Sequence, residues 1–92
     1  MAQRPPRVGK ELIAVIKRQI ALGDPPETAE TFDRLIDDGH PEPEVYKMLA
    51  CVLTTDIFEM LKEKRPFDRE LYARRLHALP TLPWDMEEAE EA

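Results

Sequence analysis

The chain has 92 residues, of which 42% are hydrophobic and 35% charged, and it carries a net charge of -6. This length predicts one small domain with a modest core, and the acidic balance argues against a nucleic-acid partner, which requires a basic face. No apolar run approaches the roughly 20 residues of a membrane-spanning helix, so we expect no membrane partner. The single cysteine, Cys51, excludes an internal disulfide and favours a cytoplasmic location.

Prolines divide the chain into four proline-free stretches, and the apolar residues of each stretch recur with helical periodicity. The first stretch predicts a helix over residues 8–22, which ends at Gly23 because glycine readily adopts the left-handed conformation at a helix end. The apolar face of this helix is expected to comprise Val8, Leu12, Val15, Ile16 and Ile20.

The second helix is expected to begin in the sequence Asp24-Pro25-Pro26-Glu27 and to end at Gly39. Asp24 is a good N-cap, proline is favourable in the first helical turn, and Glu27 stands at the capping-box position. The buried side of this helix is predicted to consist of Ala29, Phe32, Leu35 and Ile36.

The third helix is predicted to begin within residues 41–44 and to end near Lys64. Apolar side chains cover most of its circumference, which is typical of a helix at the centre of a fold or at a subunit contact. The fourth helix is predicted to begin at the N-cap Asp68, with Phe67 packing on Tyr72, and to end at Pro80. The segment Leu82-Pro83-Trp84 is then expected to fold back onto the helices.

These elements predict an all-α fold, a compact four-helix bundle with a long central third helix and a short C-terminal tail. Residues 8–85 are expected to form a single helical domain. Residues 1–7 are predicted to be a flexible N-terminus, and residues 86–92 an acidic disordered tail.

Three of the predicted helices carry one polar residue each on an apolar face: Gln19 on the first, Asp56 on the third and Arg75 on the fourth. A buried carboxylate must be paired, hydrogen-bonded or protonated. We therefore predict a polar network in which Gln19 donates to Asp56, Arg75 forms a bidentate ion pair with Asp56, and Tyr46 and Tyr72 add hydroxyl groups. Our interpretation is that this network fixes the helix register. The alternatives are a ligand pocket around Asp56 and a different helix packing that exposes Asp56.

Charge is unevenly distributed along the chain. The first 20 residues contain five basic side chains and one acid, whereas the last eight residues contain five acids. The simplest interpretation is a solvated basic face and a tail that aids solubility. The alternatives are a pairing of the two ends, within or between molecules, and docking of the acidic tail on a basic partner.

No motif in the sequence points to catalysis or to a cofactor. His40, His77 and Cys51 share no metal-ligand spacing, and the three glycines lie at helix edges, where they form no phosphate-binding loop. We therefore expect no catalytic residue, no metal and no cofactor. The charged residues around the end of the third helix are interpreted as a solvated face; they are Glu59, Lys62, Glu63, Lys64 and Arg65.

Four segments of the chain together make a pattern that can be compared with other proteins. They are Gln19-Ile20, Asp24-Pro25-Pro26-Glu27-Thr28, Met48 to Phe58 with its Asp56-Ile57-Phe58 triplet, and Arg65-Pro66-Phe67-Asp68. This pattern resembles a group of small bacterial conserved proteins and domains of unknown function, over about residues 10 to 80. The resemblance implies a helical fold but no particular chemistry. Some of those proteins carry metal-binding histidines on the first and third helices, which this sequence lacks.

The sequence as a whole predicts a small cytoplasmic helical protein that acts as a non-enzymatic protein-interaction or structural module. Cys51, Phe58 and Leu61 form an apolar strip on the side of the third helix away from Asp56, which makes a homodimer plausible. The alternative is a ligand-binding or enzyme subunit with a pocket at Asp56 and Arg75, in which Arg75 holds an anion and Asp56 acts as acid or base. A third interpretation is a regulatory protein whose acidic tail binds a basic partner.

Overall fold

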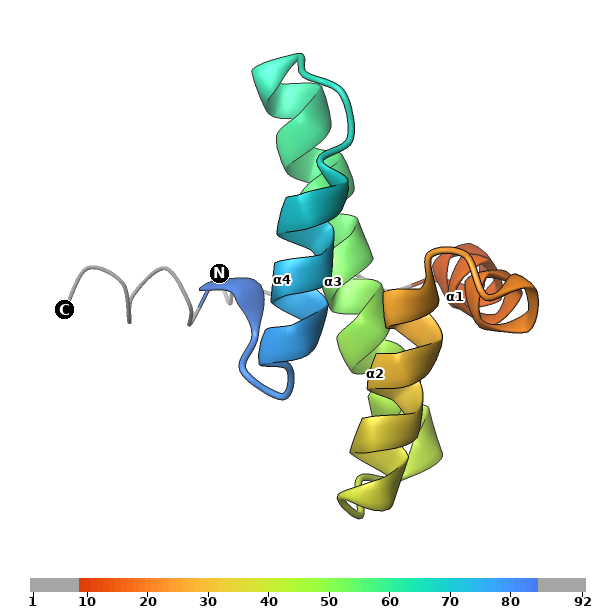
Figure 1. Ribbon diagram of the computed structural model, residues 1–92. Helices are drawn as coiled ribbons and strands as arrows, with labels where there is room; N and C mark the ends of the chain where they lie inside the picture. The colour runs from red at the N-terminus through yellow and green to blue at the C-terminus, as the bar shows by residue number, and fades with distance from the viewer. Residues whose placement is uncertain (1–8, 85–92) are drawn as a thin grey trace, which may run out of the picture.

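The computed structural model describes residues 9–84 and folds them into four helices, with no strand in this part of the chain (Figure 1). The helices are α1 (Lys10–Leu22), α2 (Pro26–Asp37), α3 (Glu42–Glu63) and α4 (Arg69–Ala78). The expected all-α fold of four helices with a long third helix is thus confirmed. The predictions for residues 1–7, for Val8 and for residues 85–92 fall outside the described residues.

Helix α3 is the central element of the domain. It packs against each of the other three helices, while α2 also packs against α1 and α4. Figure 1 shows α3 running the full height of the view, with α2 beside its lower half, α4 beside its middle, and α1 crossing at a steep angle. The wide apolar coverage of α3 follows from this position, because a helix with neighbours on several sides buries most of its circumference.

The core draws on all four helices and on the residue that follows α4. Its fully or almost fully buried apolar side chains are Ile16, Leu35, Val45, Leu49, Ala50, Val52, Leu53, Tyr72, Leu76 and Leu79. Five of these ten residues lie on α3, so this helix supplies half of the core residues that surround the polar residues described below.

Several helix ends have the predicted geometry. Gly23 at the end of α1 is left-handed, with φ of 66°, as expected for a glycine after a helix. The Asp68 carboxylate accepts a hydrogen bond of 3.1 Å from the backbone N–H of Leu71, which confirms Asp68 as the N-cap of α4. The predicted packing of Phe67 on Tyr72 is also present, with ring centroids 5.2 Å apart.

The start of α2 differs from the prediction. Pro25, and not Asp24, is the N-cap of α2, in an extended conformation with φ of -73° and ψ of 150° and with no side-chain cap. Asp24 therefore lies one residue too early to reach the first free N–H groups, and its Oδ1 instead accepts a hydrogen bond of 3.4 Å from Arg69 Nη2. The helix also ends at Asp37, two residues before the predicted Gly39.

Two predicted faces are only partly correct. Val15 was expected on the buried face of α1 but remains 42% exposed, because α1 buries the strip through Ile16. Helix α2 buries Thr28 and Thr31, which the apolar pattern did not predict. After α4, Leu82 packs against the core and Pro83 is buried, as expected for a segment that folds back, but Trp84 remains 43% exposed.

Candidate functional site

Asp56 and Arg75 form a buried ion pair at the contact between α3 and α4. Asp56 is 4% exposed and Arg75 is 6% exposed, and Arg75 Nη1 donates a hydrogen bond to Asp56 Oδ1. The second carboxylate oxygen, Asp56 Oδ2, is buried without a hydrogen-bond partner among the described residues. The contact is therefore single rather than the bidentate pair that the sequence predicted, and one oxygen of the acid lacks compensation for its lost hydration.

A second acid of α3, Glu59, takes the bidentate position. Arg75 Nη2 donates to Glu59 Oε2 at 3.2 Å, and Arg75 Nη1 lies 3.0 Å from Glu59 Oε1. The interpretation of Glu59 as part of a solvated face was thus wrong, because its side chain is only 22% exposed. Its position three residues after Asp56 on one helix was the available signal, since such residues lie on neighbouring parts of the same face.

The single positive charge of Arg75 does not neutralise both carboxylates that contact it, Asp56 and Glu59. Arg75 faces two acids, and Arg65 adds a contact of 3.5 Å to Glu59 and one of 2.6 Å to Glu63. Burial raises the pKa of the Asp56 carboxyl above its ordinary value, although the hydrogen bond from Arg75 opposes this shift. Burial alone would lower the pKa of Arg75, but its hydrogen bonds to Glu59 and Asp56 outweigh that effect, so Arg75 stays cationic.

Gln19 belongs to a different polar cluster. Its Oε1 accepts hydrogen bonds of 2.8 Å from Thr28 Oγ1 and of 3.0 Å from the Tyr72 hydroxyl, and among residues 9–84 these bonds replace the predicted one to Asp56. Gln19 therefore connects α1, α2 and α4 through one acceptor atom. Burial raises the pKa of the Tyr72 phenol despite its hydrogen bonds to Thr28 and Gln19, so this hydroxyl remains a donor.

Tyr46 does not join either cluster. Its ring packs on Phe32 with centroids 5.1 Å apart, and Lys17 Nζ lies 5.2 Å from the ring centroid. This arrangement is a cation–π contact at the junction of α1, α2 and the first half of α3. Among the five residues predicted to form one network, the structure thus brings together Asp56 with Arg75 and Gln19 with Tyr72, and it separates Tyr46 from both pairs.

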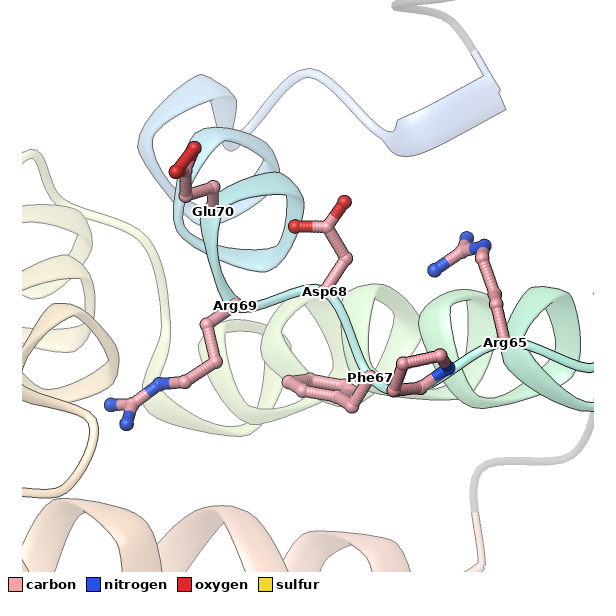
Figure 2. A pocket seen from close by; sticks show the side chains of 6 residues that line it. Arg65, Phe67, Asp68, Arg69 and Glu70 are labelled. Atoms are coloured by element: carbon pink, nitrogen blue, oxygen red, sulfur yellow. The ribbon is translucent and has the colours of Figure 1, made fainter.

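One surface hollow among the described residues lies in the connection between α3 and α4 (Figure 2). It has a volume of about 440 Å³ and is lined by residues 65–70. Figure 2 shows Arg65, Asp68 and Glu70 pointing to one side of this connection and Arg69 to the other. Three of these charges already serve local structure, since Asp68 caps α4, Arg65 holds Glu59 and Glu63, and Arg69 contacts Asp24.

A second hollow, which we call the α3 groove, lies on the outer side of α3 and has a volume of about 580 Å³. Neither Asp56 nor Arg75 lines it, but Glu59 links it to the buried ion pair. The residues that line it are Thr54, Thr55, Phe58, Glu59, Lys62, Glu63 and Trp84.

Of the predicted apolar strip of Cys51, Phe58 and Leu61, only Phe58 lines this groove. Phe58 is 63% exposed and Leu61 is 68% exposed, while Cys51 is half-buried. Burial raises the pKa of the Cys51 thiol, which keeps it in the unreactive protonated form. The strip therefore offers two large apolar side chains to solvent rather than a chemical nucleophile.

Within residues 9–84, no group of three or more His, Cys, Asp or Glu side chains is arranged to hold a metal ion. The helices of this part of the chain are also too short or too polar to cross a membrane. Comparisons of the sequence with protein-family models and with curated proteins, and of the chain with solved structures, gave no match. The resemblance to small bacterial proteins therefore stays a prediction.

Proposed function

We propose that this protein is a non-enzymatic interaction module that associates with a second copy of itself through the outer surface of α3. The observation that carries the proposal is the exposure of Phe58 and Leu61, at 63% and 68%, about one turn apart on α3, with Phe58 also lining the α3 groove. Large apolar side chains grouped next to a hollow on a small domain are typical of a protein contact. We also propose a cytoplasmic location, because the lone Cys51 suits a reducing compartment.

The alternative of a ligand pocket at Asp56 and Arg75 has less support. Both side chains are almost fully buried, and neither lines the two hollows described above. A substrate would have to displace packed core side chains to reach them. Their contacts favour a structural role, in which a buried ion pair fixes how α4 sits against α3.

The expected affinity is modest. Complete burial of a Phe or Leu side chain contributes about 1.5–3 kcal/mol, and roughly two thirds of this gain remains available at Phe58 and Leu61. Two copies would therefore gain roughly 4–8 kcal/mol from these four side chains, which is comparable with the lower part of the cost of association. We therefore expect a weak dimer with a dissociation constant of about 1 mM or above, rather than an obligate one.

Sedimentation velocity over about 0.05 to 3 mM protein tests this proposal. We expect the sedimentation coefficient of the unmodified chain to rise with concentration and that of Phe58→Ser/Leu61→Ser to stay at the monomer value. The matched control is Val15→Ser/Leu22→Ser, which removes two apolar side chains of similar exposure from α1 and should leave the association unchanged.

Two results would count against the proposal. A chain that sediments as a monomer over the whole range has no self-association to explain. A control variant that dissociates as readily as Phe58→Ser/Leu61→Ser would place the contact elsewhere, or would show that any loss of apolar surface weakens it.

A further inference from the structure

We infer that the α3 groove of one copy binds the basic, proline-containing segment of residues 4–8 from a second copy. This inference rests on the proposed self-association and names what occupies the groove. The segment reads Arg4-Pro5-Pro6-Arg7-Val8, and three features of the groove match it: aromatic walls, an accessible acid group and a suitable size.

Aromatic walls are the first feature. Phe58 from α3 and Trp84 from the segment after α4 both line the groove and keep 63% and 43% of their surface exposed. Proline-rich segments bind preferentially in grooves with aromatic walls, because proline rings pack flat on aromatic rings and a Pro-Pro sequence loses little conformational entropy on binding. Guanidinium groups also stack favourably on Trp and Phe faces.

Charge is the second feature. The groove is lined by two carboxylates, Glu59 and Glu63, against one ammonium group, Lys62. Glu59 is largely engaged by Arg75, whereas the Glu63 side chain remains 54% exposed and has a contact with Arg65 through one oxygen. Glu63 is therefore the acid best placed to receive an arginine of the segment in a charge-assisted hydrogen bond.

The size of the groove is the third feature. Its volume of about 580 Å³ falls in the range of roughly 300–1,000 Å³ that is usual for binding sites. The groove is therefore large enough for the rings and side chains of a short extended segment, but not for a whole helix.

A second copy is the source of the segment because the proposed self-association brings the outer surface of α3 against a neighbouring copy. Each copy has one such segment and one such groove, so a two-fold pair can satisfy both contacts in the same way. The acidic sequence of residues 85–92 is the less favourable occupant, because its five acids would face Glu59 and Glu63.

The test uses the fluorescence of Trp84, the only tryptophan of the chain. The full chain with Arg4→Glu/Arg7→Glu should associate more weakly than the unmodified chain in sedimentation, and its Trp84 should be more accessible to acrylamide. A peptide of residues 1–9 titrated into this variant should shift Trp84 emission to shorter wavelength with saturation. A peptide carrying both Glu substitutions should bind roughly tenfold more weakly, as expected for the loss of one exposed ion pair with Glu63 and of one guanidinium–aromatic contact.

Two matched variants locate the site. Glu63→Lys and Phe58→Ser, in the Arg4→Glu/Arg7→Glu chain, should each weaken peptide binding several-fold, and both positions are exposed enough to leave the fold intact. Arg18→Glu/Lys47→Glu makes the same change in net charge at exposed positions outside the segment and should leave both association and Trp84 accessibility as in the unmodified chain.

The results separate this inference from the proposed function. If Phe58→Ser/Leu61→Ser abolishes the dimer but the peptide produces no saturable change in Trp84 emission, the groove inference is overturned and the self-association stands. If the peptide binds but the chain is a monomer at every concentration, a second copy is not the source and the self-association falls. Peptide binding that survives Phe58→Ser and Glu63→Lys but is lost on deletion of residues 86–92 would place the segment on the acidic tail and overturn the inference.

Discussion

Arg75 on α4 and Glu59 on α3 are joined by two parallel contacts, of 3.2 Å between Nη2 and Oε2 and of 3.0 Å between Nη1 and Oε1. Glu59 thereby shares the guanidinium with the more deeply buried Asp56. Because the guanidinium retains a negative partner in Glu59, it does not depend on Asp56 alone for its neutralisation.

Asp56→Ala should destabilise the domain by about 2–4 kcal/mol, because it removes one member of a buried ion pair and leaves space beside the guanidinium. Asp56→Asn should cost roughly 1 kcal/mol, since its carboxamide oxygen can still accept from Arg75. Urea denaturation monitored by circular dichroism measures both free energies of unfolding. A loss below about 0.5 kcal/mol for Asp56→Ala would mean that the ion pair contributes little to the folded state.

The pH dependence of stability should report the raised pKa of Asp56. An acid whose pKa is higher in the folded than in the unfolded state binds its proton more tightly when folded. Its contribution is complete below the ordinary pKa of Asp and is lost as the pH rises through the folded-state value. The unmodified chain should therefore gain stability relative to Asp56→Asn as the pH falls from 7 toward 4, in urea titrations of both proteins. A relative loss over this range would show that Arg75 dominates and lowers the pKa.

Gln19 should be energetically coupled to Tyr72. Tyr72→Phe removes the 3.0 Å hydrogen bond to Gln19 Oε1 and should cost about 1 kcal/mol. Gln19→Ala leaves the hydroxyls of both Thr28 and Tyr72 without this acceptor and should cost about 2 kcal/mol. In thermal unfolding, the double variant should lose less stability than the sum of the two single variants. Strict additivity would mean that the two side chains do not interact in solution.

The N-cap of α4 should matter more than the exposed ion pair next to it. Asp68→Ala removes the acceptor for the Leu71 N–H and should cost about 1 kcal/mol. Arg69→Ala breaks the contact with Asp24, in which both side chains are mostly exposed, and should change stability by less than about 0.5 kcal/mol. Equal losses in chemical denaturation would contradict this ranking.

The local signals in the sequence predicted most of the helix boundaries, and the exceptions have a physical reason. Gly23, Asp68 and the Phe67–Tyr72 contact depend on residues close in sequence, so the pattern was sufficient. Asp24 satisfied the same capping rule, but Pro25 took the N-cap position because its extended backbone suits that role equally well. The local sequence pattern does not determine which of two adjacent residues is the N-cap when both are favourable at a helix start.

For the candidate site, the sequence by itself determined that Gln19, Asp56 and Arg75 lie on apolar faces, because helical periodicity places them there whatever the packing. Asp56 and Arg75 are buried as this predicts, but the pattern missed the buried Thr28 and Thr31 of α2. Only the tertiary structure decided the partners. The angles at which α1 and α4 cross α3 direct Gln19 toward Thr28 and Tyr72 and bring Glu59 to Arg75. These contacts join residues that are 9 to 53 positions apart in the chain. Periodicity fixes the direction of a side chain around its own helix, but it carries no information on how far away the neighbouring helix lies or how it is rotated.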